Sequence, residues 1–329
     1  MTYLILALVL GIIVGANDAV NVFGSAIGSK MLKFSQAILF FIIFIILGAI
    51  INAQYPSAIY QNIIPSYFSI DKTFIILVPV IVATLFSIKL KISSSISQSL
   101  VFSIIGFAIA TDLNINYIIF EQLVFVWVLT PFISFLLVII LHLLINSCLN
   151  ILKLNMFYKD FVIRTLLILF GSLAAFALGS NLTASIVGIF SPFLNSSIHI
   201  NENLLFFLGS SCIGLGAFFF SKKIIHNIGT KVSKINPVSA LAILATQIVI
   251  LLFFSSKLII DYVNLKFGIN LFAMPISASH VTLASILGIA VFKGFKETNI
   301  KNSLFIISSW IYLPVIVFIF SYYLSLTFR

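Results

Sequence analysis

The chain has 329 residues, of which 61% are hydrophobic and 8% are charged, and its formal net charge is +10. Soluble globular domains carry about 25% charged residues, so this composition excludes a soluble enzyme, a DNA-binding module and a disordered chain. We therefore expect an all-α polytopic membrane protein embedded in a lipid bilayer. The basic residues lie mainly in short loops between apolar runs, where they indicate membrane topology and not nucleic-acid binding.

Ten apolar segments are predicted to be membrane helices, since a spanning helix needs about 20 mostly apolar residues. In chain order they are 2–27, 36–53, 73–88, 99–111, 117–147, 161–194, 203–221, 237–256, 280–292 and 302–326. The segment 161–194 is long enough that we expect a break within it. The short segments 99–111 and 280–292 follow polar residues, so each is predicted to continue from a re-entrant polar tip. Such backbone is tolerated at membrane depth where it lines a protein or water cavity. The sequence thus predicts about 10–12 membrane segments, including two re-entrant tips.

The basic residues also predict an orientation. With the N-terminus outside and five crossings in each half, 14 basic residues lie inside and four outside, which agrees with the positive-inside rule. We expect a multi-pass protein of the cell (inner) membrane with both termini outside. The basic stretch 151–164 is then a cytoplasmic linker between a first transmembrane unit, 1–150, and a second unit, 165–329.

Three segments of the first half recur in the second half in the same order. The pairs are 15–24 with 179–188, 95–98 with 277–280, and 127–131 with 310–314, at offsets of 164, 182 and 183 residues. The change in offset predicts an insertion near 257–270. If each half crosses the membrane an odd number of times, the second copy is inverted. Inverted repeats with interrupted, polar-tipped segments are typical of secondary transporters.

Asp18 is the one carboxylate well inside an apolar segment. A charge at bilayer depth costs at least about 2.5–3.5 kcal/mol, so we expect a bound cation or a proton to compensate it. Asn17 and Asn21 are four residues apart and share one helical face, beside Asp18. A local helix cap is the alternative role for Asp18.

The two polar tips have the chemistry of an anion cradle. Their hydroxyls, and the unpaired N–H groups at the start of each following helix, can hold an oxyanion without a fixed positive charge. The first tip offers Ser95, Ser97 and Gln98, and the second offers Ser277, Ser279 and His280. Two facing tips would hold a tetrahedral oxyanion between them, whereas helix capping is the alternative for either tip alone.

Motifs for other functions are missing from the sequence. There is no GxxxxGK[ST], GxSxG or HExxH motif, so neither ATP-driven transport by this chain nor common hydrolase chemistry is supported. His142, His199 and His226 are scattered, and no metal site is expected beyond one for a transported Na⁺. We expect no enzyme activity and no cofactor other than a co-transported Na⁺ or H⁺.

Residues 15–30, GANDAVNVFGSAIGSK, resemble the GANDVANAFGTAVGSK signature of the inorganic phosphate transporter (PiT) family. Residues 275–280, PISASH, resemble that family's PVSTTH element, and 228–237 resemble its TIGKKI…P stretch. The order of these motifs agrees from residue 11 to about residue 314. The resemblance implies an inverted-repeat transporter that moves inorganic phosphate with Na⁺ or H⁺, a few members of the family carrying sulfate.

The resemblance also assigns roles by position. The cation site would contain Asn17, Asp18, Asn21 and Asn181. The phosphate site would contain residues of both signatures and both tips, namely Asn17, Asp18, Asn181, Thr183, Ser95, Ser97, Gln98, Ser277, Ser279 and His280. The chain departs from the second signature at Leu182, where the family has Asp, and at Ser185, where it has Asn.

We therefore predict a cation-coupled phosphate permease that works by alternating access. The alternative within the same class is a permease for sulfate or another oxyanion. A passive anion channel, with the tips as its selectivity filter, is the alternative from a different class. A homodimer is one assembly that we consider.

Overall fold

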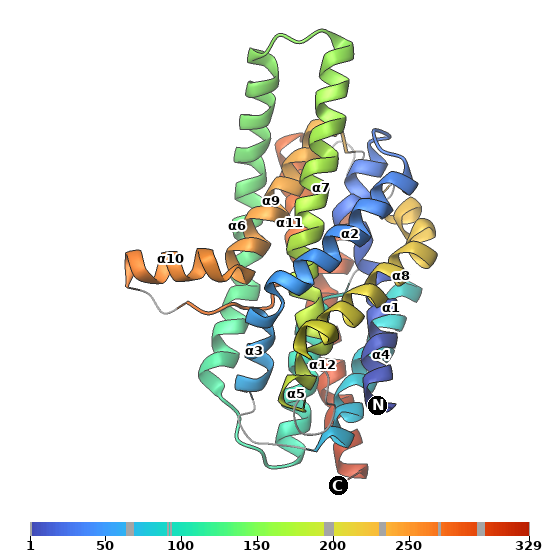
Figure 1. Cartoon of the computed structure of the whole chain (residues 1–329), viewed down its shortest axis with the longest axis vertical. Helices are drawn as coiled ribbons and strands as arrows, with labels where there is room; N and C mark the ends of the chain where they lie inside the picture. The colour runs from blue at the N-terminus through green and yellow to red at the C-terminus, as the bar shows by residue number, and fades with distance from the viewer. Residues whose placement is uncertain are drawn as a thin grey trace.

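The computed structural model describes residues 2–63, 69–90, 92, 94–193, 201–229, 235–268, 271–294 and 300–328. These residues form α-helices and two short 3₁₀ helices, without a β-strand among them (Figure 1). The elements are α1 (Thr2–Gly28), α2 (Phe34–Asn52), α3 (Gln54–Ile63), η1 (Ile70–Lys72), α4 (Thr73–Leu90), α5 (Ile96–Ala110), α6 (Tyr117–Ile151), α7 (Met156–Val187), η2 (Gly188–Phe193), α8 (Glu202–Gly229), α9 (Pro237–Ser255), α10 (Lys257–Phe267), α11 (Ala278–Phe292) and α12 (Ile300–Thr327).

The described residues contain eight helices that are long and apolar enough to cross a membrane, and two shorter apolar helices, α5 and α11. Each of the ten predicted segments overlaps one of these helices. The outer faces of the long helices are apolar: Phe125 and Phe132 of α6 are 65% and 67% exposed. A surface of this kind is stable against lipid and not against water. The expected all-α multi-pass membrane protein is confirmed.

Segment 161–194 differs from its prediction. Helix α7 runs without interruption from Met156 to Val187, and only then continues into the 3₁₀ helix η2. The α-helix therefore ends inside the predicted segment, but near its C-terminal end and not in its middle. Its glycines, Gly171 and Gly179, lie where other elements pack closely on α7, so they serve helix contact and do not interrupt the helix. The first turns of α7 also include residues 156–164 of the predicted linker.

Helices α3 and α10 lie outside the predicted segments. Helix α3 follows α2 directly and contacts α7 and η2. Helix α10 occupies the region where the insertion was expected, and it projects sideways from the bundle (Figure 1). Only α3 contributes to the polar centre described below.

The two halves pack on each other through exchanged partners. Helix α1 packs on α8 and α2 on α7, while α5 packs on α12 and α11 on α6. At the first crossings, a side chain added at Gly15 would overlap the backbone carbonyl of Ile213, and one at Gly179 would overlap that of Ile45. Glycine is required at both positions because a backbone carbonyl cannot rotate away as a side chain can.

Helices α1 and α7 run in opposite directions. Figure 1 shows both chain termini at one end of the molecule and the turn between α6 and α7 at the other end. Helix α1 therefore leaves the end from which the N-terminus starts, and α7 returns toward it. This arrangement brings residues 17–21 of α1 and 181–185 of α7 into the interior of the bundle.

Candidate functional site

Asp18 lies inside the helix bundle and is 2% exposed. Its Oδ1 accepts hydrogen bonds from Nδ2 of Asn17, at 3.2 Å, and from Nδ2 of Asn21, at 3.0 Å. No other Asp or Glu, and no Lys or Arg, is buried in the part of the chain that the structure describes. A buried carboxylate held by neutral amides alone needs a bound cation or a proton to offset its desolvation.

The equivalent position in the second half is filled by Leu182, which is 3% exposed. Its neighbour Asn181 does not bond to a carboxylate as Asn17 does. Instead, Nδ2 of Asn181 donates to the carbonyl of Ile276 at 2.6 Å, and its Oδ1 accepts from the Ile276 N–H at 2.8 Å. The amide of Asn181 therefore holds the backbone of the segment that precedes α11.

Two polar segments meet face to face at the starts of α5 and α11. We name residues 94–98 the first tip and residues 276–280 the second tip. The Ser97 hydroxyl donates to the Ile276 carbonyl at 3.4 Å, and the Ser279 hydroxyl donates to the Ser94 carbonyl at 3.4 Å. These two bonds correspond under the 182-residue offset. Residues far apart in the chain are thus in contact, as expected for two tips that face each other.

Each tip also caps its own helix. The Ser95 hydroxyl accepts from the Gln98 N–H, and the Ser277 hydroxyl accepts from the His280 N–H, both at 3.4 Å. Ser277 and Ser279 are 3.1 Å apart through their hydroxyl oxygens. The capping considered for a single tip is therefore present in both, together with the contact between the tips.

His280 is placed between two tryptophans. Its ring stacks on Trp310 at 3.9 Å between centroids, and its Nδ1 lies 3.4 Å from the Trp127 carbonyl. Nε1 of Trp127 donates to the Pro275 carbonyl at 2.9 Å. Nε2 of His280 is buried without a hydrogen-bond partner, and so is Oε1 of Gln98 at the equivalent position of the first tip. The Ser94 hydroxyl oxygen is also buried without a partner, so the first tip keeps two polar atoms with bonding capacity for a ligand and the second tip keeps one.

Two residues of the polar centre were missed by the sequence analysis. Nε2 of Gln247, on α9, donates to the Asn21 carbonyl and to the Thr282 hydroxyl. A lone amide inside an apolar segment is itself a signal, by the argument that singled out Asp18. Tyr60 of α3 bonds to Ser185, and it gave no signal because α3 lies outside the predicted segments.

Other predicted residues lie apart from the centre or outside the described part of the chain. The Thr183 methyl group faces α8, 3.4 Å from a Cβ built at Gly209, so its contact with substrate stays a prediction. His199, and residues 230–232 of the stretch that resembles TIGKKI, lie outside the described residues. Within those residues, no group of three or more His, Cys, Asp or Glu could hold a metal ion.

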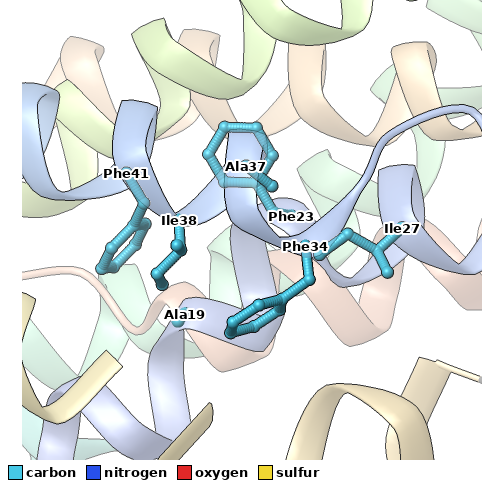
Figure 2. Close-up of a pocket in the computed structure, with 7 residues that line it drawn as sticks. All are labelled: Ala19, Phe23, Ile27, Phe34, Ala37, Ile38 and Phe41. Atoms are coloured by element: carbon cyan, nitrogen blue, oxygen red, sulfur yellow. The ribbon is translucent and has the colours of Figure 1, made fainter. Parts of the chain in front are cut away.

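A hollow between α1 and α2 is not the polar centre. Figure 2 shows its lining, which is entirely apolar: Ala19, Phe23, Ile27, Phe34, Ala37, Ile38 and Phe41. An oxyanion needs hydrogen-bond donors, and a cation needs oxygen ligands. The hollow supplies neither.

A helical membrane bundle with a buried carboxylate and paired polar helix starts is characteristic of secondary transport proteins. The chain belongs to the phosphate transporter family, whose model matches residues 14–260. This is a family of transporters and not of enzymes, and nothing in its description indicates a cofactor.

The chain is similar along nearly its whole length to a protein of Bacillus subtilis named a probable low-affinity inorganic phosphate transporter. The two are 25% identical over 317 residues, which cover 93% of this chain and 90% of the relative. A shorter match, 36% identical over 63 residues, covers 19% of this chain and 17% of the sulfate permease CysP of Bacillus subtilis. A solved structure titled the sodium-dependent phosphate transporter has the same fold, with a TM-score of 0.75 and 19% identity, over 100% of this chain and 99% of that one.

Proposed function

We propose that the chain is a cation-coupled inorganic phosphate permease that works by alternating access. The observation that carries this proposal is Asp18, a buried carboxylate with two amide donors and no other buried charged residue in the described chain. A permanent charge at this depth is costly, whereas a charge that is neutralised in each transport cycle can couple ion binding to movement. Membership of the phosphate transporter family supports phosphate as the anion.

The cation, Na⁺ or H⁺, would bind at Asp18, with Asn17 and Asn21 beside it. Neutralising the carboxylate removes its repulsion toward an incoming anion, so the two ions favour the same closed state. The full-length fold match to a structure titled the sodium-dependent phosphate transporter supports Na⁺ as the first cation to test.

The oxyanion would bind where the two tips meet. The contacts between them, Ser97 to Ile276 and Ser279 to Ser94, are 3.4 Å long, at the weak end of hydrogen bonds. An anion could replace them at little cost, because charge-assisted bonds are roughly twice as strong as neutral ones. The unpartnered Nε2 of His280 would complete the cradle as a donor, and the unpartnered Oε1 of Gln98 would accept from a protonated oxygen of the anion.

Alternating access would rest on two inverted repeats, 1–150 and 165–329, joined by a cytoplasmic linker at 151–164. The exchanged helix partners, the equivalent glycine crossings and the opposite directions of α1 and α7 support this division (Figure 1). We further propose the cell (inner) membrane as the location, with both termini outside. The position of both termini at one end of the molecule, opposite the α6–α7 turn, supports that orientation.

The test is uptake of labelled phosphate into proteoliposomes, with Na⁺ and H⁺ gradients imposed separately. Asp18→Asn is expected to abolish gradient-driven uptake, because a neutral amide has no negative charge for a cation to neutralise. Asp160→Asn, at an exposed position on α7, is the matched control and should transport normally. Undiminished gradient-driven uptake by Asp18→Asn would contradict the proposal.

Sulfate is the second candidate substrate, favoured by the local match to a sulfate permease. Unlabelled sulfate that competes with labelled phosphate as strongly as phosphate itself would support this alternative. A passive channel is distinguished in the same vesicles. Its flux would persist without a cation gradient, whereas uptake by a coupled permease saturates and collapses when the gradient is removed.

A further inference from the structure

Tyr60 of α3 reaches the polar centre from outside both signatures and both tips. Its side chain is buried, and its hydroxyl donates to the Ser185 hydroxyl at 2.7 Å. The Ser185 oxygen lies 3.1 Å from the Ser97 hydroxyl of the first tip, and Ser185 also donates to the Asn181 carbonyl at 3.1 Å. Three hydroxyls from α3, α7 and α5 therefore form one connected group.

This group joins the two tips. Ser97 bonds to both Ser185 and the Ile276 carbonyl, while Asn181 holds Ile276 from the other side. The Tyr60 hydroxyl donates its one hydrogen to Ser185, and its oxygen also interacts with the Ser97 side chain. Ser185 must then use its own hydrogen on the Asn181 carbonyl or on Ser97. When Ser185 donates to Ser97, the Ser97 hydrogen is left for the Ile276 carbonyl of the second tip.

The packing of α3 fixes the tyrosine. Gly188 starts η2, and a Cβ at this position would lie 3.0 Å from Ser57 Cβ and 3.2 Å from Tyr60 Cδ2. The end of α7 and helix α3 are thus in close contact at the turn that carries Tyr60. The tyrosine ring has little freedom to move its hydroxyl away from Ser185.

In the first half, the residue at the position equivalent to Ser185 has a different hydrogen-bond partner. With the 164-residue offset, Ser185 corresponds to Asn21, which bonds to the Asp18 carboxylate. In the second half the carboxylate is replaced by Leu182, and the smaller Ser185 bonds to Tyr60 instead. The phenol hydroxyl thus provides a polar partner at the position where the second half lacks a charged one.

We propose that Tyr60 is a positioning residue for the oxyanion site, acting through Ser185 to set Ser97 of the first tip against the second tip. This inference rests on the proposed phosphate transport. Tyr60 itself does not bind the anion. Its removal should loosen the anion site while the helices that carry the transport movement remain intact.

The experiment measures the KM and Vmax of phosphate uptake in proteoliposomes for Tyr60→Phe, Ser185→Ala and the double variant. Each single variant is expected to raise KM about 3- to 10-fold, the effect of losing one net hydrogen bond, with Vmax within about twofold of wild type. Because both substitutions remove the same bond, the double variant should raise KM no more than the larger single effect. Ser185→Thr retains the hydroxyl and should restore a KM near that of wild type.

Tyr55→Phe is the matched control, since Tyr55 lies on the same helix and its ring faces Nζ of Lys257 at 5.6 Å. It should leave KM unchanged. An unchanged KM in Tyr60→Phe, additive effects in the double variant, or a fall in Vmax alone would overturn the role of Tyr60. If Tyr60→Phe does not fold, Ser185→Ala and Ser185→Thr test the same bond from its other end. Wild-type protein without phosphate uptake would contradict the proposed function instead.

Discussion

Asn17 and Asn181 occupy equivalent positions in the two halves, yet replacing each with alanine should have different consequences. Asn181→Ala removes two hydrogen bonds, of 2.6 and 2.8 Å, from the backbone of Ile276, a residue that is 1% exposed. Asn17→Ala removes one of the two amide donors of Asp18, while Asn21 remains. The difference lies in what each substitution leaves unpaired.

The expected magnitudes follow from those unpaired groups. A buried donor or acceptor without a partner costs about 1–3 kcal/mol. Asn181→Ala leaves both the N–H and the C=O of Ile276 without their Asn181 partner, although the carbonyl keeps a weak bond from Ser97. We therefore expect the free energy of unfolding to fall by about 2–5 kcal/mol for Asn181→Ala and by about 0.5–1.5 kcal/mol for Asn17→Ala. A native protein is stable by about 5–15 kcal/mol, so the first loss is large.

The assay is unfolding of the purified protein in mild detergent by added SDS, followed by tryptophan fluorescence. The chain has two tryptophans, and both contact His280 of the second tip, so the signal reports the region that Asn181 holds. Asn150→Ala, at an exposed position near the end of α6, is the control and should unfold as wild type does. Equal losses of unfolding free energy for Asn17→Ala and Asn181→Ala would refute the two Asn181–Ile276 hydrogen bonds as the source of the extra stability.

Two further substitutions test the packing and the second tip. Gly15→Ala should prevent normal folding, because the new methyl group overlaps a backbone carbonyl of α8, whereas Gly294→Ala, at φ 76° with open space around it, should cost only about 1–2 kcal/mol; equal melting temperatures of the two variants in detergent would contradict this. Trp127→Phe should raise the KM of phosphate uptake about 2- to 10-fold by leaving the Pro275 carbonyl without its 2.9 Å donor. Trp310→Phe, whose indole N–H has no partner, should change KM less, and the opposite order would contradict the assigned contact.

The spanning helices could be predicted from the sequence because length and hydropathy are local properties. The segment predicted at 237–256, for example, is the helix Pro237–Ser255. The same reasoning missed α3 and α10. Both are short and carry polar residues such as Gln54 and Asp261, so neither has the long apolar run on which the prediction depends.

The members of the polar centre were more predictable than their contacts. Asp18 is identifiable because a carboxylate inside an apolar run is costly, and the tips because serine clusters recur in register. The partners of these residues come from distant parts of the chain. Asn181 is 95 residues from Ile276, and Tyr60 is 125 residues from Ser185. No local pattern encodes such pairs, which depend on how α3, α7 and the tips pack together.

Packing and the site place different requirements on the two halves of the chain. Close glycine crossings and reciprocal contacts of the tips occur in both halves, as the predicted repeat requires. The signatures differ where charge is involved. Leu182 needs no counter-charge, so the adjacent Asn181 is available to hold the second tip, while Asn17 is bound to the carboxylate of Asp18. The first half therefore provides the buried charge, and the second half provides the firmly held tip that faces it.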